Sequence, residues 1–360
     1  MPPISVCMIA KNEEADLARC LESVKPYGFE VILTDTGSTD RTKEIARRYG
    51  AKVFEFPWIG DFSAARNYSA AQAANNWILV IDCDEYITHI DLPPILDLIK
   101  KYPRLAGMLE WENEMLGNDN TPGNENIRTF TTKIVRFYHR KYYHYTGTIH
   151  EQVVPIGAFE ENDLKAFDIP LRLYHTGYVG SPEKIAAKNK RNMDMLLEAI
   201  EKNPADAYNY FQVGQTYIGY EDYEAACEWF GKALSFDLEP SLEYVQMMMV
   251  SYGQSLLLLN KNEEALSFAG VYDAFCGMTD FVYLMGRIYE ANNQPIKALG
   301  EFLKAITMPS GMQAGVNSFL PCYQIAVIYD NMNNMDIAVM YYNKCGDFAP
   351  AKRRLIELNG

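Results

Sequence analysis

Five apolar residues lead directly into three carboxylates in Trp77-Ile78-Leu79-Val80-Ile81-Asp82-Cys83-Asp84-Glu85. An uninterrupted apolar run of this length predicts a strand buried on both faces of a parallel sheet. Ligands of open α/β sheets bind beyond the carboxyl ends of the strands, where these acids would lie. Asp82 and Asp84 would project to the same side of an extended backbone, and paired oxygen ligands suit Mg²⁺ or Mn²⁺ carrying a diphosphate. The alternative is a solvated acidic turn, which a D-x-D pattern alone does not exclude.

Composition limits the class of protein. The chain has 360 residues, enough for two domains, and its net charge of −14 argues against broad binding to nucleic acid or anionic membranes. No apolar run reaches the ~18 residues of a membrane span, and the start lacks the basic region of a signal peptide. Seven scattered cysteines without C-x-x-C spacing are typical of a reduced protein, so we expect a cytoplasmic location.

The first hundred residues alternate between strand and helix patterns. Strands are predicted at 4–9, 31–33 and 51–56, ahead of the acidic strand. A first helix is predicted from Asn12, as N-cap, to about Val24. A second follows the loop that ends at Asp40 and runs through Tyr49, and a third covers roughly 63–75. This order predicts a mostly parallel, doubly wound sheet.

The loop Asp35–Asp40 has the composition of a nucleotide-binding turn. Gly37 permits a positive φ, Ser38 and Thr39 offer hydroxyls, and Asp35 can accept hydrogen bonds from a base or ribose. The alternative is a helix N-cap formed by Asp35 or Ser38.

Four segments together resemble the family 2 glycosyltransferases of the GT-A fold. They are Met8-Ile9-Ala10-Lys11-Asn12-Glu13-Glu14, Asp35-Thr36-Gly37-Ser38-Thr39-Asp40, Asp61-Phe62-Ser63-Ala64-Ala65-Arg66-Asn67 and Asp82-Cys83-Asp84-Glu85. The resemblance is close over roughly residues 4–100 and looser to about residue 178. It implies a Rossmann-like catalytic domain that binds a nucleotide-sugar donor, most simply a UDP-sugar, across the strand ends.

The resemblance also implies roles for single residues on the donor side. The backbone near Ala10, in the segment that contains Glu13, and the Asp35 carboxylate would hold the nucleobase. Arg66 would face the nucleotide, as suits a guanidinium. Asp82 would face the ribose and Asp84 would bind Mn²⁺ or Mg²⁺ on the diphosphate.

Two acidic-segment residues have less defined roles. Cys83 belongs to this donor-binding segment, but its side chain should point away from the two aspartates and pack. Glu85 would either support the metal ligands or be solvated.

The segment 133–153 would supply the acceptor side. An inverting transfer needs a carboxylate to take the acceptor proton, and Glu151 in His150-Glu151-Gln152 resembles that acid in the family. The alternative is a surface acid at a strand end. His175, after an apparent strand, would complete the metal site, with His150 as its competitor. Residues 116–126 read as a plain loop, although a lid over the donor has a similar composition.

The C-terminal half has a different pattern. Ser181-Pro182-Glu183 predicts a helix start, and strand signals then vanish, so we place a catalytic domain at 1–180 and an all-α repeat domain at 181–360. Small and aromatic residues recur at offsets of 39, 33 and 40, near the 34-residue tetratricopeptide unit. The repeat positions are Tyr210, Gly214, Tyr217, Ala226, Phe230 and Ala233; Gly253 and Ala265 in a poorer copy; Gly286, Tyr289, Ala298, Phe302 and Ala305; and Ala326, Tyr329, Ala338, Tyr342 and Pro350.

The organisation of the chain resembles bacterial family 2 enzymes with tetratricopeptide-like tails, among them peptide S-glycosyltransferases. The repeats would then bind a peptide or protein acceptor, or form a homodimer. One alternative keeps the chemistry and uses a lipopolysaccharide-core or surface-glycan acceptor. Another is a non-catalytic scaffold with a vestigial GT-A domain, although all the expected acids are present.

Overall fold

The computed structural model describes residues 2–116, 127–157, 165–176 and 182–359. The loop predicted at 116–126 therefore lies, apart from Leu116, outside the described residues. The chain forms two compact units, Met1–Met195 and Leu196–Gly360, and the division falls inside helix α5 (Pro182–Lys202). The predicted helix start at Pro182 is confirmed, and the domain boundary at 180/181 stays a prediction.

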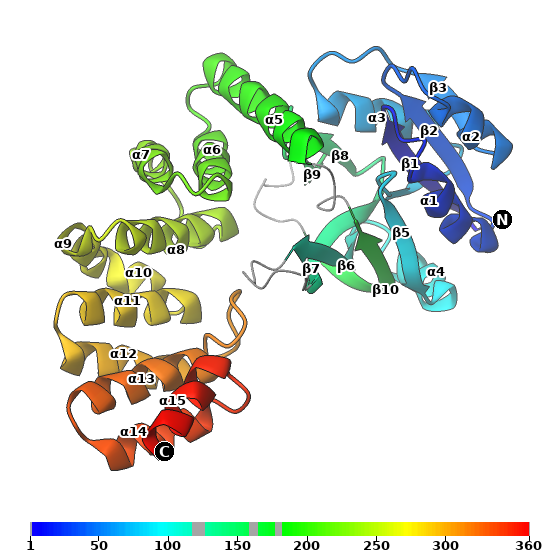
Figure 1. The fold of residues 1–360 in the computed structure, drawn as a ribbon. Coiled ribbons are helices and arrows are strands. Elements are labelled where there is room, and N and C mark those ends of the chain that lie inside the picture. The colour runs from blue at the N-terminus through cyan, green and yellow to red at the C-terminus, as the bar shows by residue number, and fades with distance from the viewer. Residues whose placement is uncertain (1, 117–126, 158–164, 177–181, 360) are drawn as a thin grey trace. The chain divides into compact units, whose positions relative to one another are not determined.

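In the described part of the first unit, eight strands form one sheet in the order β3-β2-β1-β4-β7-β6-β10-β5, and β8 and β9 pair separately (Figure 1). Four pairings are parallel, and those of β7 with β4 and β6 and of β10 with β5 are antiparallel. The strands are β1 (Ile4–Ala10), β2 (Glu30–Asp35), β3 (Lys52–Glu55), β4 (Trp77–Val80), β5 (Glu85–Ile90), β6 (Ala106–Leu116), β7 (Ile127–His139), β8 (Tyr143–Thr146), β9 (Gln152–Pro155) and β10 (Ala166–His175).

Alternating side chains divide the core between the two faces of this sheet. Trp77, Leu79 and Ile81 pack in one cluster with residues of α1 (Leu17–Val24), α2 (Thr42–Arg48) and α4 (Leu92–Lys101). Ile78 and Val80 pack in the other, with residues of α3 (Phe62–Gln72) and the β8–β9 hairpin. Because β4 is buried on both faces, its apolar run needs no polar alternation, as predicted.

Several predicted boundaries are wrong for local reasons. The first helix begins at Leu17, and Asn12 is not its cap but takes a left-handed φ of 61° and bridges two loops. Neither Asp35 nor Ser38 caps α2, which begins at Thr42. Asp61 caps α3, accepting a hydrogen bond from the Ala64 amide at 2.9 Å.

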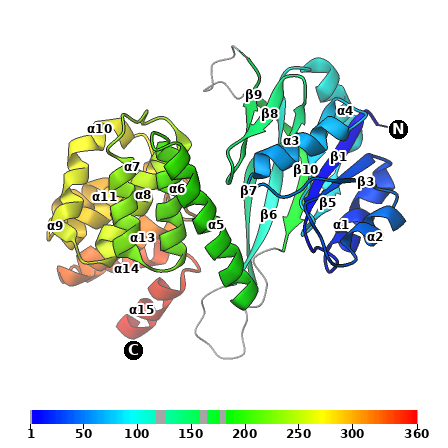
Figure 2. The ribbon, with the colours of Figure 1, turned by 90° about the horizontal axis from the view of Figure 1, so that it is seen from above.

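The described residues of the second unit form helices joined by turns and loops, and no strand (Figure 2). After α5 come α6 (Ala207–Gly219), α7 (Tyr223–Ala233), α8 (Glu243–Leu258), α9 (Asn262–Ala265), η2 (Leu266–Val271), α10 (Tyr272–Phe275), α11 (Thr279–Ala291), α12 (Pro295–Thr307), α13 (Phe319–Asn331), α14 (Met335–Lys344) and α15 (Ala349–Asn359). No helix of the described chain is both long and apolar enough to cross a bilayer.

The predicted repeat period is visible in the backbone. Glu221, Asn260, Asn293 and Asn333 all have φ between 56° and 59°, and their spacings are the predicted 39, 33 and 40 residues. Each follows the first helix of a pair and turns the chain into the second. The poorer second copy is the one whose second helix is broken, into α9, η2 and α10.

Candidate active site

The acids after β4 lie on a turn rather than on an extended backbone. The Glu85 amide donates to the Asp82 carbonyl at 3.1 Å, and the Asp82 amide donates to the Glu85 carboxylate at 2.8 Å. The expectation of an extended D-x-D is therefore wrong in its geometry. The expected separation of side chains still holds, because Cys83 is buried in the core on the side of α1 and its thiol donates to the Ile9 carbonyl at 3.6 Å.

Asp82 is held by two arginines. Arg66 of α3 contacts both carboxylate oxygens, at 2.9 and 3.2 Å, and Arg136 of β7 contacts one of them at 2.7 Å. Burial alone would raise the pKa of Asp82, but Arg136 and Arg66 outweigh it and hold that pKa well below the usual range. Asp82 is therefore ionised near neutral pH and fixed in orientation.

Glu85 is the most buried acid of this cluster, at 1% exposure, so the expectation that it could be solvated is wrong. Its carboxylate accepts from the Trp111 indole at 2.8 Å and from Arg136 at 3.2 Å. Burial raises the pKa of Glu85 despite the neighbouring Arg136. Glu85 therefore supports the turn that carries Asp82 and Asp84.

Asp84 points toward a different partner, His175 at the end of β10, with Oδ2 and Nε2 3.2 Å apart. The His175 ring stacks on Trp111, with centroids 5.0 Å apart, and its Nδ1 lies 2.9 Å from Asn113 Oδ1. The Asn113 amide nitrogen donates to the Trp111 carbonyl at 3.4 Å, which fixes the amide with its oxygen toward the ring. This placement of the Asn113 oxygen favours a hydrogen on His175 Nδ1.

This tautomer has a consequence for metal binding. With a hydrogen on Nδ1 and none on Nε2, the His175 ring would present the Nε2 lone pair to the Asp84 carboxylate, and two acceptor atoms would face each other. Such a pair is stabilised by a proton or by a metal ion. Their 3.2 Å separation is close to the roughly 3 Å expected between adjacent ligands of an ion with bonds of about 2.1 Å.

Asp84 and His175 could supply two ligands to a metal ion whose other ligands come from outside the protein. Among the described residues no group of three or more His, Cys, Asp or Glu side chains could hold a metal by itself. Mg²⁺ and Mn²⁺ sites with one or two protein ligands usually complete their coordination with substrate phosphates and water. Asp84 and His175 meet that requirement. In the part of the chain that the structure describes, His150 makes no such contact with Asp84.

Helix α3 joins the turn that carries Asp82 to the β8–β9 hairpin. The Arg66 Nε donates to the Glu151 carboxylate while its other nitrogens hold Asp82. Burial alone would lower the pKa of this guanidinium, but the carboxylates of Asp82 and Glu151 outweigh burial and raise that pKa above its usual value. Arg66 therefore stays charged. Glu151 thus lies at the same arginine as the predicted ribose ligand, on the tip of the hairpin.

Backbone contacts fix this hairpin to the helix. The Asn67 side chain donates to the Tyr145 carbonyl at 2.8 Å and accepts from the Tyr145 amide at 2.9 Å. The Phe62 amide donates to the Thr148 carbonyl at 2.9 Å. The position of Glu151 therefore depends on α3 as well as on its own strand.

The predicted nucleobase loop is ordered by its own residues. The Asp35 carboxylate accepts from the Gly37 and Ser38 amides, each at 3.1 Å, and is almost fully buried. The Ala10 carbonyl accepts from the Thr36 amide at 2.8 Å. Gly37 has the predicted positive φ, 111°. These bonds build a fixed rim beyond β1 and β2, where the nucleobase was predicted to lie.

Glu13 completes the acidic side of the site. Burial raises the pKa of Glu13 to about 7, with further contributions from Asp84, Asp16 and Asp82, while Lys188 of α5 opposes them. Glu13 is therefore partly protonated near neutral pH.

Sequence reasoning missed Arg136, Trp111 and Asn113, which hold the turn and the His175 ring. Trp111 and Asn113 lie two apart on β6, so they project from one face of that strand. An arginine within the otherwise apolar run Ile134–Tyr138 was the one signal available for Arg136.

Comparisons with known proteins agree with this architecture. The family model described as "Glycosyl transferase family 2" matches residues 5–152, and the tetratricopeptide repeat model matches residues 207–240 and 321–351. The chain therefore carries a family 2 glycosyltransferase domain followed by tetratricopeptide repeats. The expected fold class, a GT-A-like α/β domain and a helical repeat domain, is confirmed.

Curated relatives are named for one or the other of these two parts. A TPR repeat-containing protein of Synechococcus elongatus is 30% identical over 246 residues, 68% of this chain and 60% of that protein. An uncharacterized glycosyltransferase of Rickettsia typhi is 34% identical over 160 residues, 43% of this chain and 53% of that protein. The SPbeta prophage-derived glycosyltransferase SunS of Bacillus subtilis is 24% identical over 245 residues, 65% of this chain and 54% of that protein. The chain thus spans somewhat more than half the length of these relatives.

Proposed function

We propose that this protein is an inverting, metal-dependent glycosyltransferase that moves a sugar from a nucleotide-sugar donor, a UDP-sugar in the simplest case, to a peptide or protein acceptor. The observation that carries the proposal is the position of Arg66, which contacts Asp82 and Glu151 at once. Two carboxylates from segments 69 residues apart in sequence thus converge on one arginine, as an enzyme that binds donor and acceptor together requires.

Each proposed role follows from chemistry. Asp82, kept ionised by two arginines, accepts hydrogen bonds from the ribose, and Asp35 and the backbone near Ala10 border the base. Asp84 and His175 would hold Mn²⁺ or Mg²⁺. That ion, when bound, neutralises charge on the departing diphosphate. The similarity to family 2 glycosyltransferases supports these roles.

Glu151 is the proposed general base. It takes the proton of the acceptor nucleophile as that atom attacks the anomeric carbon and the bond to the diphosphate breaks. Arg66 holds the carboxylate in place, and the hydrogen bonds of Asn67 to Tyr145 fix the hairpin that carries it.

The repeats are the proposed acceptor-binding part. Stacked helix pairs form extended surfaces suited to a peptide, and this fold supports a polypeptide acceptor over a glycan. A cytoplasmic location and a homodimer formed through the repeats stay predictions.

A donor panel tests the proposal. The full chain is incubated with Mn²⁺ and UDP-, GDP- and TDP-sugars, and released nucleotide is measured by mass spectrometry. We expect slow hydrolysis of one donor class and its loss in Glu151→Gln. Release of no nucleotide, with no binding of any donor, would favour the vestigial scaffold. A second incubation, with labelled donor and whole-cell fractions, tests the acceptor. Label in the glycolipid fraction alone, with no labelled peptide, would show that the acceptor is a glycan and not a polypeptide.

A further inference from the structure

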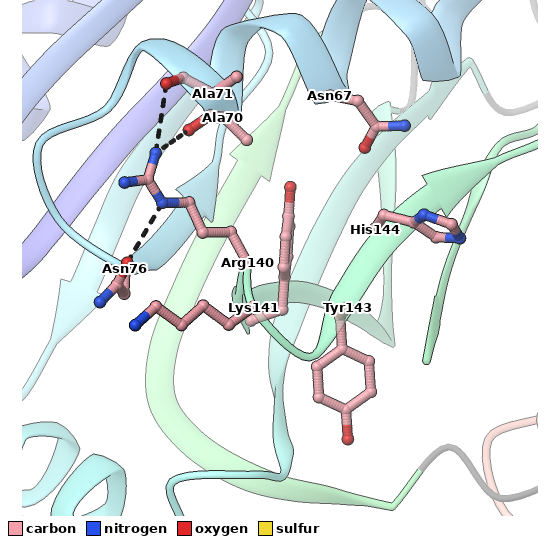
Figure 3. Close-up of a pocket in the computed structure, with 9 residues that line it drawn as sticks. Asn67, Ala70, Ala71, Asn76, Arg140, Lys141, Tyr143 and His144 are labelled. Carbon is pink, nitrogen blue, oxygen red and sulfur yellow. Dashed lines mark hydrogen bonds between the residues drawn. The ribbon is translucent and has the colours of Figure 1, made fainter. Parts of the chain in front are cut away.

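A pocket of ≈ 430 Å³ lies away from the proposed active site, between the second half of α3, the end of β7 and the start of β8 (Figure 3). Antiparallel pairing places His139 of β7 beside Trp77, at the beginning of β4, whereas Asp82 follows the other end of β4. The pocket and the proposed active site therefore lie at opposite ends of β4. Its lining residues are Asn67, Ala70, Ala71, Asn76, Tyr138, Arg140, Lys141, Tyr143 and His144.

The lining is cationic in an acidic protein. It contains Arg140 and Lys141 and no carboxylate, although the chain as a whole has a net charge of −14. Lys141 is exposed, and its ammonium forms no ion pair with any residue of the described chain. A local positive field of this kind attracts anions, and no carboxylate in the lining repels them.

The Arg140 guanidinium is fixed in position by three hydrogen bonds. Its Nη1 donates to the Ala70 and Ala71 carbonyls at 2.8 and 3.3 Å, and its Nε donates to Asn76 Oδ1 at 3.3 Å, as the dashed lines in Figure 3 show. The helix carbonyls offset part of its charge, but Nη2 forms no hydrogen bond with the described residues. A guanidinium fixed in this way loses little conformational entropy when an anion binds.

Tyr138 also lines the pocket, but its hydroxyl does not open into it. The side chain is 1% exposed, and the hydroxyl oxygen is closed off from solvent and has no hydrogen-bond partner among the described residues. Recognition of a ligand therefore depends on Arg140 and Lys141.

We propose that this pocket binds a small phosphate-bearing molecule, with Lys141 and Arg140 contacting the phosphate. Its volume lies within the roughly 300–1,000 Å³ of small-molecule sites and exceeds what inorganic phosphate alone would fill. An organic part the size of a monosaccharide would use the remaining space, beside Asn76 and His144.

Calorimetry on the full chain tests this site. Inorganic phosphate, glucose 6-phosphate and glucose are titrated in chloride buffer containing EDTA, so that no metal at the donor site binds phosphate. We expect equimolar, salt-sensitive binding of phosphate, equal or tighter binding of glucose 6-phosphate, and none of glucose. Binding of glucose as tight as that of glucose 6-phosphate would overturn the proposed anion recognition, as would absence of binding by both phosphates.

Variants locate the binding. Lys141→Ala should weaken glucose 6-phosphate binding roughly tenfold, since it removes one charged donor. Lys100→Ala, an exposed lysine of α4, and Asp84→Asn, in the donor site, should leave it unchanged. Lys141 is exposed and its variant should fold normally, which circular dichroism checks. Unchanged binding in Lys141→Ala, or loss in Asp84→Asn, would show that the phosphate binds elsewhere.

Discussion

Glu13 lies among like charges, and this situation has a measurable effect on stability. Its pKa is raised to about 7 by burial and by Asp84, Asp16 and Asp82. The folded chain therefore binds a proton that the unfolded chain has released above its ordinary carboxyl pKa. As pH rises from about 4.5 to 7 the free energy of unfolding falls, and it does not recover at higher pH.

Glu13→Gln removes the ionisable carboxyl group, and with it the loss of stability at high pH. In EDTA, we expect the variant to raise the melting temperature of the first unit by about 2–4 °C at pH 8, for a gain of about 1 kcal/mol after solvent screening, and by little at pH 4.5. Differential scanning calorimetry at both pH values measures it, with Glu44→Gln on the surface of α2 as control. An equal shift at both pH values would show that ionisation of Glu13 does not destabilise the fold.

Among single residues, the sequence predicted those that lie in the four motifs but not those that hold the motif residues in place. Asp82, Asp84 and Arg66 stand in recognisable segments, so their proximity could be anticipated. Arg136 contacts Asp82 from 54 residues away, and that contact depends on β7 entering the sheet antiparallel beside β4. A single sequence does not reveal this pairing, because local patterns do not encode strand order.

Among the elements, α3 contacts both the turn that carries Asp82 and the hairpin that carries Glu151. Arg66 binds Asp82 and Glu151, and Asn67 binds the backbone of the hairpin at Tyr145. Successive helical residues diverge by about 100°, so one helix can contact two structures at once.

Asn67→Ala should loosen the hairpin while leaving the donor residues in place. We expect the turnover number for donor hydrolysis to fall about tenfold or more, since a small displacement of a base is costly, while the Kd for UDP changes less than about twofold. Steady-state kinetics and calorimetry measure the two quantities. Gln72→Ala at the end of the same helix is the control. A parallel loss of UDP affinity in Asn67→Ala would mean that the residue acts on donor binding instead.

Element boundaries were predicted less well than element types. The strand and helix order from β1 to β4 is as expected, but β5, β8 and the antiparallel partners were not foreseen. Asn12 has a good capping side chain, yet its amide and side chain bind Ser38 and Thr39 of a neighbouring loop. Tertiary contacts here outweigh a local capping preference.

In the whole molecule, the repeat unit depends on close approach of paired helices. A Cβ added to Gly286 would lie 2.5 Å from the ring of Phe302, and one at Gly214 would lie 2.4 Å from Phe230. The repeat pattern predicted small residues at both positions for this reason. Gly300, on α12, has nothing within 4 Å of its added Cβ.

Gly286→Ala should therefore destabilise the second unit by about 1–3 kcal/mol, because the Phe302 ring has to move. Gly300→Ala, its matched control, should stabilise it by up to about 1 kcal/mol through helix propensity. Urea unfolding followed by circular dichroism measures both. Equal effects of the two substitutions would contradict the assigned helix pairing.

The central claim is that Asp84, with His175, holds a metal ion that binds the donor diphosphate. Calorimetric titration of UDP in Mn²⁺ and in EDTA tests it most directly, on the full chain, Asp84→Asn and Asp97→Asn, an exposed control on α4. We predict that the full chain and Asp97→Asn bind UDP at least about tenfold more tightly in Mn²⁺, and that Asp84→Asn loses this difference. The same Mn²⁺-dependent gain in Asp84→Asn would contradict the account.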